Sequence, residues 1–260
     1  MTDMITSTSN PQVKNLMQLV KKAKVRNEQR LFVVEGTKMF SEAPRKWMQQ
    51  IYVSETFLTV KEDRELLTDL PYEVLADHVF KAVSDTQTPQ GILCLLTMPS
   101  FELSDLLGQT NPQLLILESI QDPGNLGTMF RTGEGAGIAG IIMNRTTVDV
   151  FNPKTIRSTM GSIYRVPFVV TDDLSGTLAE IKAQGIKLYA AHLKGLQSYD
   201  EPDYKHATGF LIGNEGNGLS DTIADMADTY IRIPMAGQVE SLNAAIAATL
   251  LMYEAARQRR

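Results

Sequence analysis

The chain has 260 residues, 43% of them hydrophobic and 21% charged, which is the composition of an ordinary globular protein with one large domain or two modest ones. No apolar run approaches the roughly 18 residues that a membrane-spanning helix needs, and the first residues lack a basic and apolar secretion signal. The lone cysteine, Cys94, excludes an intramolecular disulfide and a cysteine-rich metal site, so we expect a cytoplasmic protein in which Cys94 is an inert core thiol.

The net charge of −5 is unevenly distributed along the chain. Residues 1–50 carry nine Lys or Arg against four Asp or Glu, whereas the remainder carries 16 basic and 26 acidic residues. A basic end on an acidic protein is typical of a part that contacts phosphate. On charge alone, a solvated helix face is the simpler interpretation.

The first 98 residues predict a compact α/β region. Residues 9–11 can cap a helix whose apolar residues, from Val13 to Val20, have helical spacing. The other elements expected here are a helix over 37–48 that Pro44 breaks or bends, and strands over 31–36, 51–54, 72–75 and 91–96. Prolines, a glycine and polar residues over 99–112 indicate a linker with room for one short helix.

From residue 113 onward, strands alternate with helices, which predicts a parallel sheet covered on both faces. The expected strands are 114–117, 138–143, 167–170 and 187–191, with two more around Phe210 and Ile231. The expected helices are 125–134, 152–160, 174–183 and about 241–257.

One glycine pattern imitates a dinucleotide-binding motif. Residues 135–140 match G-x-G-x-x-G, but they follow a helix and lead into a strand, whereas the phosphate-binding version follows a strand and opens a helix. We therefore interpret them as a helix C-cap with close helix–strand packing.

The most informative segments lie in the last third of the chain. They are Gly213-Asn214-Glu215-Gly216-Asn217-Gly218 after one strand, Ile233-Pro234-Met235-Ala236-Gly237 after the next, and Ser241-Leu242-Asn243 before the last helix. This order predicts two neighbouring loops whose main chain can bind a small ligand closely, because glycine lets the backbone approach.

A third loop follows the strand at 114–117. Asp122-Pro123-Gly124 predicts a tight turn, and Asn125 occupies an expected helix N-cap position. Arg131, six residues further, offers a planar charged fork suited to phosphate. Taken alone, this segment fits a plain cap and a surface charge equally well.

Taken together, these segments resemble the SpoU/TrmH family of RNA 2′-O-ribose methyltransferases, within the SPOUT superfamily. The resemblance covers about residues 114–257. It implies a parallel-sheet α/β domain whose C-terminal segment forms a deep trefoil knot, and a homodimer with the active site near the interface. A looser resemblance, through residues 30–36 and the strands up to Leu96, implies an RNA-binding domain with a fold like certain ribosomal proteins. The expected division is a substrate-binding domain over 1–98, a linker over 99–112 and a methyltransferase domain over 113–260.

The resemblance also implies roles for single residues. It implies that S-adenosylmethionine is held in the knot by the main chain of the last two loops; its expected cofactor residues are Gly213, Gly218, Ile233, Met235 and Leu242. Its expected polar active-site residues are Asn125, Arg131, Glu215, Ser241 and Asn243. Structural alternatives remain: Glu215 can brace the glycine loop, Ser241 can cap the last helix, and Asn243 can hold that cap.

Chemically, we expect Arg131 to hold a phosphate and to stabilise the developing alkoxide, because a guanidinium is effectively always protonated and makes a poor base. Asn152, Arg157 and Ser158 form a second polar group, on a helix that faces RNA or is an ordinary surface helix. His192 follows a strand near the cofactor loops, either in the pocket or as a plain loop histidine, and no histidine spacing indicates a metal site.

The expected function is therefore S-adenosylmethionine-dependent 2′-O-methylation of structured RNA, with ribosomal RNA first and transfer RNA as an alternative. A non-catalytic RNA-binding assembly factor is a second interpretation, against which the full polar set speaks. A small-molecule or protein methyltransferase is a third, against which the basic N-terminal region speaks.

Overall fold

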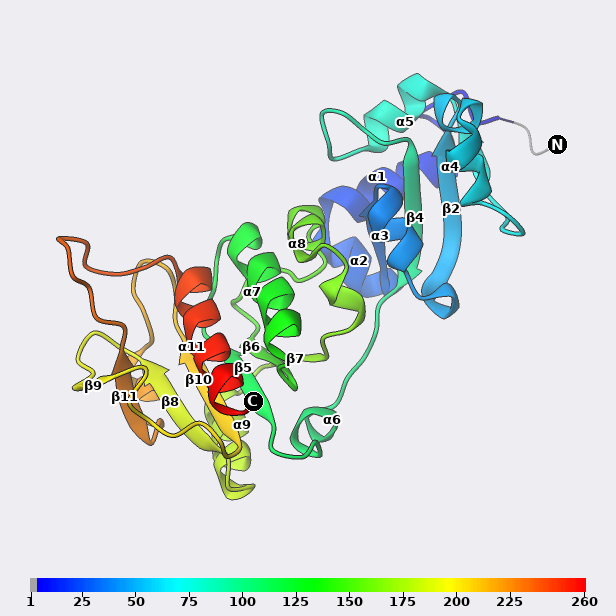
Figure 1. Cartoon of the computed structure of the whole chain (residues 1–260). Coiled ribbons are helices and arrows are strands. Elements are labelled where there is room, and N and C mark those ends of the chain that lie inside the picture. Colours follow the sequence, from blue (N-terminus) through cyan, green and yellow to red (C-terminus); the bar gives the residue numbers. More distant parts are fainter. Residues whose placement is uncertain (1–3) are drawn as a thin grey trace. The chain divides into compact units, whose positions relative to one another are not determined.

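The computed structural model describes residues 4–260, so the first three residues of the expected substrate-binding domain lie outside it. The chain forms two compact units (Figure 1). The first unit comprises the residues up to Pro99 together with Asp149–Tyr164, and the second comprises Ser100–Val148 and Arg165–Arg260. A segment from the expected methyltransferase range thus packs within the first unit.

The first unit is built on a four-stranded mixed sheet in the order β1-β4-β2-β3, in which β4 runs antiparallel to both of its neighbours and β3 runs parallel to β2. Its strands are β1 (Leu31–Glu35), β2 (Met48–Ser54), β3 (Glu73–Leu75) and β4 (Ile92–Thr97). Its helices are α1 (Pro11–Lys21), α2 (Ala23–Gln29), α3 (Thr37–Glu42), α4 (Lys61–Glu65), α5 (Asp77–Val83) and α8 (Pro153–Thr159), with 3₁₀ turns η1 (Arg45–Trp47), η2 (Thr56–Thr59) and η3 (Ser162–Tyr164).

Two differences from the expected elements have local causes. The break expected at Pro44 in the helix over 37–48 is confirmed, since α3 ends at Glu42; the difference is that the chain after the break forms the 3₁₀ turn η1 and enters β2 at Met48. Helices α2, α4 and α5 were not expected, since each has at most seven residues and too few turns to show periodicity. Cys94 is fully buried on β4, and this burial raises the pKa of its thiol to about 12, which confirms an inert core residue.

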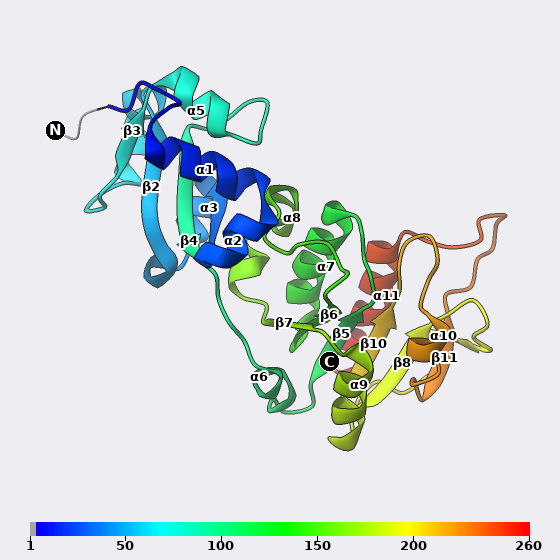
Figure 2. The same cartoon turned by 180° about the vertical axis from the view of Figure 1, so that it is seen from behind.

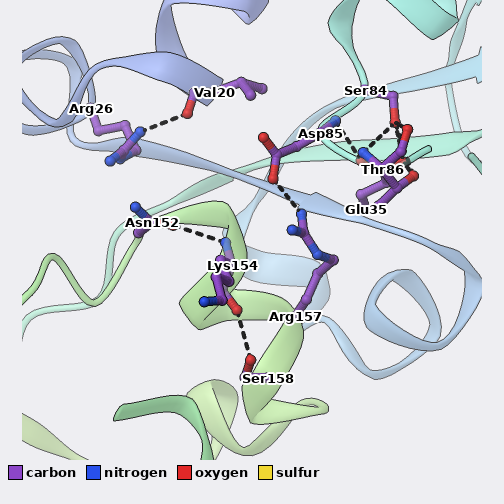
Figure 3. A network of polar contacts seen from close by, with 10 residues as sticks. All are labelled: Val20, Arg26, Glu35, Ser84, Asp85, Thr86, Asn152, Lys154, Arg157 and Ser158. Carbon is purple, nitrogen blue, oxygen red and sulfur yellow. Dashed lines mark hydrogen bonds and ion pairs between the residues drawn. The ribbon is translucent and has the colours of Figure 1, made fainter. Parts of the chain in front are cut away.

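Ion pairs hold the segment 149–164 within the first unit, and Figure 3 shows one of them, between Arg157 and Asp85. The guanidinium of Arg26 is 3% exposed; it pairs with Asp149 and donates to two main-chain carbonyls near the end of α1, at 2.6 and 3.1 Å. On α8, Arg157 donates to the carboxylate of Asp85 at 2.7 Å. The segment is therefore an integral part of this unit.

The second unit is built on seven parallel strands in the order β7-β6-β5-β10-β8-β11-β9. They are β5 (Gln113–Leu117), β6 (Gly140–Asn144), β7 (Phe168–Thr171), β8 (Lys187–Ala191), β9 (Gln197–Ser198), β10 (Thr208–Ile212) and β11 (Thr229–Arg232). The helices are α6 (Leu103–Leu107), α7 (Pro123–Ala136), α9 (Leu174–Ala183), α10 (Asp221–Ala224) and α11 (Ala244–Gln258).

Helices cover both faces of this sheet. Helices α7 and α11 pack against each other on one face, while α6, α9 and α10 share one hydrophobic cluster with alternate residues of the strands on the other (Figures 1 and 2). The expected parallel α/β architecture is confirmed, and the trefoil knot stays a prediction.

The glycine pattern at 135–140 is a structural feature, as expected. Gly137, with φ of 74°, ends α7 in the left-handed conformation. A Cβ on Gly140 would lie 2.6 Å from the side chain of Leu106, so this glycine permits close packing of α6 on β6.

No helix within residues 4–260 combines the length and the apolar character that a membrane crossing requires. Over the same range, no three His, Cys, Asp or Glu side chains are grouped so that they could hold a metal ion.

Candidate cofactor cavity and active site

A cavity of about 260 Å³ opens in the second unit at the carboxyl ends of β8, β10 and β11. Four segments contribute its lining: residues 191–193, 212–219, 231–235 and 240–247. Ligands of parallel α/β sheets bind at this edge, and the volume lies just below the roughly 300–1,000 Å³ of small-molecule sites. The two glycine-containing loops singled out from the sequence therefore face one cavity.

The glycine loop after β10 is closed on itself. Asn214 and Gly218 exchange two main-chain hydrogen bonds, of 3.0 and 2.9 Å, and the side-chain Oδ1 of Asn214 accepts from the N–H groups of Gly216 and Asn217. A Cβ on Gly213 would lie 2.1 Å from the main chain of Gly218, which itself has φ of 70°. The closed loop thus requires glycine at both ends, and main chain forms much of the cavity wall.

Glu215 ties this loop to the loop after β5. Its carboxylate accepts from the N–H groups of Gln121 at 3.0 Å and Asp122 at 3.1 Å, and from the side-chain amide of Asn125 at 2.9 Å. Partial desolvation raises the pKa of Glu215, but the hydrogen bonds from Asn125, Gln121 and Asp122 outweigh it and hold the pKa below its ordinary value. The carboxylate is therefore a brace and a weak proton acceptor.

Asn125 continues this network to the last helix. Its side-chain Oδ1 accepts from the amide of Asn243 at 2.9 Å, and Asn243 in turn caps α11 by accepting from the N–H groups of Ala245 and Ile246. The chain Glu215–Asn125–Asn243 joins the three segments that the sequence placed together.

One expected cap is wrong, and one structural alternative is excluded. The N-cap of α7 is Asp122, whose carboxylate accepts from the N–H of Asn125, so Asn125 lies inside the first turn. The last helix begins at Ala244 with Asn243 as its cap, so Ser241 precedes the helix and does not cap it. At α7, two cap-forming residues lie three positions apart, and the later one was expected as the cap.

The expected cofactor residues all line the cavity: Gly213, Gly218, Ile233, Met235 and Leu242. Of the polar set, Glu215 and Ser241 line it, and Asn125 and Asn243 join it through Glu215. The sequence did not single out Glu240, which also lines the cavity.

Arg131 stands apart from this group. It is exposed on α7, does not line the cavity, and has no ion-pair partner within residues 4–260. A single copy of the chain therefore does not bring this guanidinium to the cavity. Asn152, Arg157 and Ser158 lie on or beside α8 in the first unit, where Asn152 caps the helix and Arg157 pairs with Asp85.

His192 lines the cavity, which decides between the two positions left open by the sequence. Its Nδ1 accepts from the N–H of Lys194 at 3.1 Å, and its ring lies 4.9 Å from that of Tyr230. Accepting at Nδ1 places the proton of the neutral imidazole on Nε2.

Comparison with known protein families matches both regions of the chain. The SpoU rRNA Methylase family matches residues 112–253, and the MRM3-like substrate binding domain matches residues 10–94. The 23S rRNA (guanosine(2553)-2′-O)-methyltransferase RlmP of Bacillus subtilis is 34% identical over 252 residues, which cover 96% of this chain and 97% of that protein.

Solved structures agree over almost the whole chain. An AdoMet-bound rRNA methyltransferase from Sinorhizobium meliloti, 31% identical, superposes with a TM-score of 0.87 and covers 98% of both chains. The SpoU methyltransferase AviRb from Streptomyces viridochromogenes, in complex with AdoMet, is 27% identical with a TM-score of 0.86, covering 96% of this chain and 99% of AviRb. The resemblance predicted from the loop motifs is confirmed: this chain belongs to the SpoU rRNA methylase family.

Proposed function

We propose that this protein transfers a methyl group from S-adenosylmethionine to the 2′-hydroxyl of a ribose in ribosomal RNA. Family membership supports RNA methyl transfer, and neighbours whose structures contain AdoMet support the donor. RlmP, named for 2′-O-methylation of 23S rRNA, supports the ribose hydroxyl and the RNA class. The observation that carries the proposal is the cavity, which residues of both glycine-containing loops line.

The residues around the cavity suit this donor. Main chain of the glycine loop and of residues 231–235 can pair with the edge of an adenine and with ribose hydroxyls, while Ile212, Ile231 and Leu242 provide apolar surface for the purine. The carboxylates of Glu215 and Glu240 favour a cationic ligand such as a sulfonium with its ammonium group.

Each part of the chain then has a task in the reaction. When bound, the donor supplies an activated methyl group. The two loops orient it, and the network of Glu215, Asn125 and Asn243 fixes the first turn of α7 beside the cavity. Arg131 holds a substrate phosphate and stabilises the alkoxide that forms as the ribose hydroxyl loses its proton. The low pKa of Glu215 favours water or a phosphate oxygen as the proton acceptor.

A homodimer is part of the proposal, because Arg131 needs a second copy to reach a cavity. Helix α11 supports this arrangement: Ile246 and Tyr253, seven residues apart on one side of the helix, are 50% and 45% exposed. Arg131 of one protomer then completes the site of the other. A trefoil knot is also proposed, and the packing of the C-terminal α11 against α7, β5 and β10 is compatible with it.

We assign RNA binding to the first unit and place the reaction in the cytoplasm. The match of residues 10–94 to a substrate binding domain supports the first assignment, and it favours structured RNA over a small-molecule or protein substrate. Transfer RNA and a purely structural role in assembly remain outcomes of the test.

The test is incubation of the protein with methyl-labelled S-adenosylmethionine and separated, unmodified ribosomal and transfer RNA, followed by mass spectrometry of the nucleosides. We expect a 2′-O-methylated nucleoside from the ribosomal fraction. A methyl group on a base, transfer only to transfer RNA, or donor binding without transfer would each contradict the proposal.

A further inference from the structure

Ser119, the second residue after β5, has an unusual backbone conformation. Its φ is 59°, in the left-handed region that residues other than glycine, asparagine and aspartate rarely adopt. Such a conformation persists only when surrounding contacts enforce it. At Ser119 the contacts that do so can be named.

Side chains from several segments engage every polar atom of Ser119. Its N–H donates to Oδ1 of Asn144 at 2.8 Å, and its hydroxyl contacts Nδ2 of Asn144 at 3.1 Å and the hydroxyl of Thr146 at 2.6 Å. Its carbonyl accepts from Nδ2 of Asn214 at 2.9 Å and from Nε2 of Gln121 at 3.0 Å. The end of β6 and the glycine loop therefore hold the turn from opposite sides.

The turn decides where the next three residues go. Ile120 is fully buried, and the N–H groups of Gln121 and Asp122 both meet the carboxylate of Glu215. If Ser119 were extended, the N–H groups of Gln121 and Asp122 would point in other directions, because successive residues of an extended chain face opposite sides. The pairing of two consecutive N–H groups with one carboxylate thus depends on the left-handed residue before them.

Asn214 has two separate functions in this arrangement. Its Oδ1 closes the glycine loop by accepting from Gly216 and Asn217, while its Nδ2 ties that loop to the carbonyl of Ser119. We infer that Ser119 is a positioning residue for methyl transfer, held in the left-handed conformation by Asn144 and Asn214 so that Glu215 can fix Asn125 and the start of α7. This inference rests on the proposed function and extends it to Ser119 and Asn144, which do not line the cavity themselves.

Asn214→Asp tests the tie selectively. An aspartate keeps the oxygen that closes the glycine loop but cannot donate to Ser119. With donor and RNA both saturating, we expect kcat to fall about tenfold, the effect of one lost hydrogen bond to a main-chain carbonyl.

Ser119→Gly supplies the second arm, because glycine adopts positive φ without steric cost. In that background the turn no longer needs the tie, so we expect Asn214→Asp to lower kcat by no more than about threefold. The introduced charge is the same in both backgrounds, so the difference between them reports on the turn. Ser119→Val, whose branched side chain resists positive φ, should lower kcat more than Ser119→Gly does.

Equal losses from Asn214→Asp in both backgrounds would overturn the inference, as would a Ser119→Gly variant no more active than Ser119→Val. A fall of melting temperature that Asn214→Asp causes equally in both backgrounds would overturn it as well, by showing general destabilisation. The unchanged protein is assayed alongside: if it methylates no RNA, the proposed function fails and the inference with it, whereas an active protein with the wrong variant pattern refutes the inference alone.

Discussion

Replacing Glu215 by alanine should loosen the glycine loop without touching any atom of its backbone. The carboxylate accepts three hydrogen bonds, of 2.9 to 3.1 Å, from Gln121, Asp122 and Asn125. Glu118 makes a second charged link between the loops after β5 and β10, by accepting from the N–H and hydroxyl of Ser220, so the substitution removes one of two such links. Glu215→Ala therefore removes the brace while it leaves Gly213 and the rest of the cavity wall in place.

The size of the effect follows from those three bonds. A hydrogen bond to a charged group contributes about 1.5–3 kcal/mol when it is buried, but Glu215 is solvent-exposed, so we take about 1.5 kcal/mol for the whole set. The closed loop is the form that binds the donor, and affinity falls with the fraction of chains in that form. Since about 1.4 kcal/mol corresponds to a factor of ten, we expect donor affinity to fall about tenfold.

The pH dependence has a definite sign. Because the folded pKa of Glu215 lies below its ordinary value of about 4.3, its stabilising contribution is complete above that value and is lost as the pH falls through the folded pKa. Donor affinity of the unchanged protein should thus be insensitive to this group at neutral pH and weaken below about pH 4.3. The alanine variant should lack this component.

Titration calorimetry with S-adenosylmethionine at several pH values measures both effects. Glu180→Ala, which removes an exposed carboxylate on α9, is the matched control and should bind normally. Glu215→Gln should fall between the unchanged protein and the alanine variant, because its amide oxygen can still accept from Asp122 and Asn125 whereas its amide nitrogen cannot accept from Gln121. Unaltered affinity in Glu215→Ala, or an unaltered acid limb, would refute the bracing role.

Further predictions concern the loop, the arginine and the first unit. Gly213→Ala should abolish donor binding in calorimetry, since its methyl group would lie 2.1 Å from main chain, whereas Gly185→Ala, at a φ of 77° but in open space, should cost only about 1 kcal/mol in urea unfolding. Arg131→Lys should lower kcat sharply and leave donor affinity unchanged, because the charge stays and the fork is lost; near-normal turnover would remove this residue from the mechanism. Asp149→Asn should destabilise the first unit by about 3 kcal/mol in urea unfolding, because it leaves a buried guanidinium unpaired, while Arg157→Gln, in a more exposed pair, should cost less than about 1 kcal/mol. Similar losses in these last two variants would contradict the reasoning.

The loops around the cavity could be predicted from the sequence, because the local backbone geometry there requires glycine. Gly213 and Gly218 are needed where main chain meets main chain, and such needs are visible in the sequence between two apolar strands. The start of α7 was mispredicted although a signal was present: Pro123 favours the first helical position, which makes Asp122 the cap and not Asn125.

Other features had no local signal. Arg26 and Asp149 lie 123 positions apart, and neither residue's neighbours show that the two form a pair. Ser119 is an ordinary serine in the sequence, and its conformation depends on side chains from β6 and from the glycine loop. Arg131 was expected at the site because of its motif, but it does not line the cavity of a single chain.

The packing of residues 149–164 within the first unit limits how this family could exchange modules. The chain passes between the two units three times, so a single recombination point near Pro99 would transfer Arg26 without Asp149 and Phe32 without Phe151, whose rings lie 4.8 Å apart. A relative that gains or loses its N-terminal module must therefore also rewrite a helix in the middle of its catalytic half. Where such an exchange changed RNA specificity among these enzymes, the N-terminal region and the segment corresponding to residues 149–164 should have changed together.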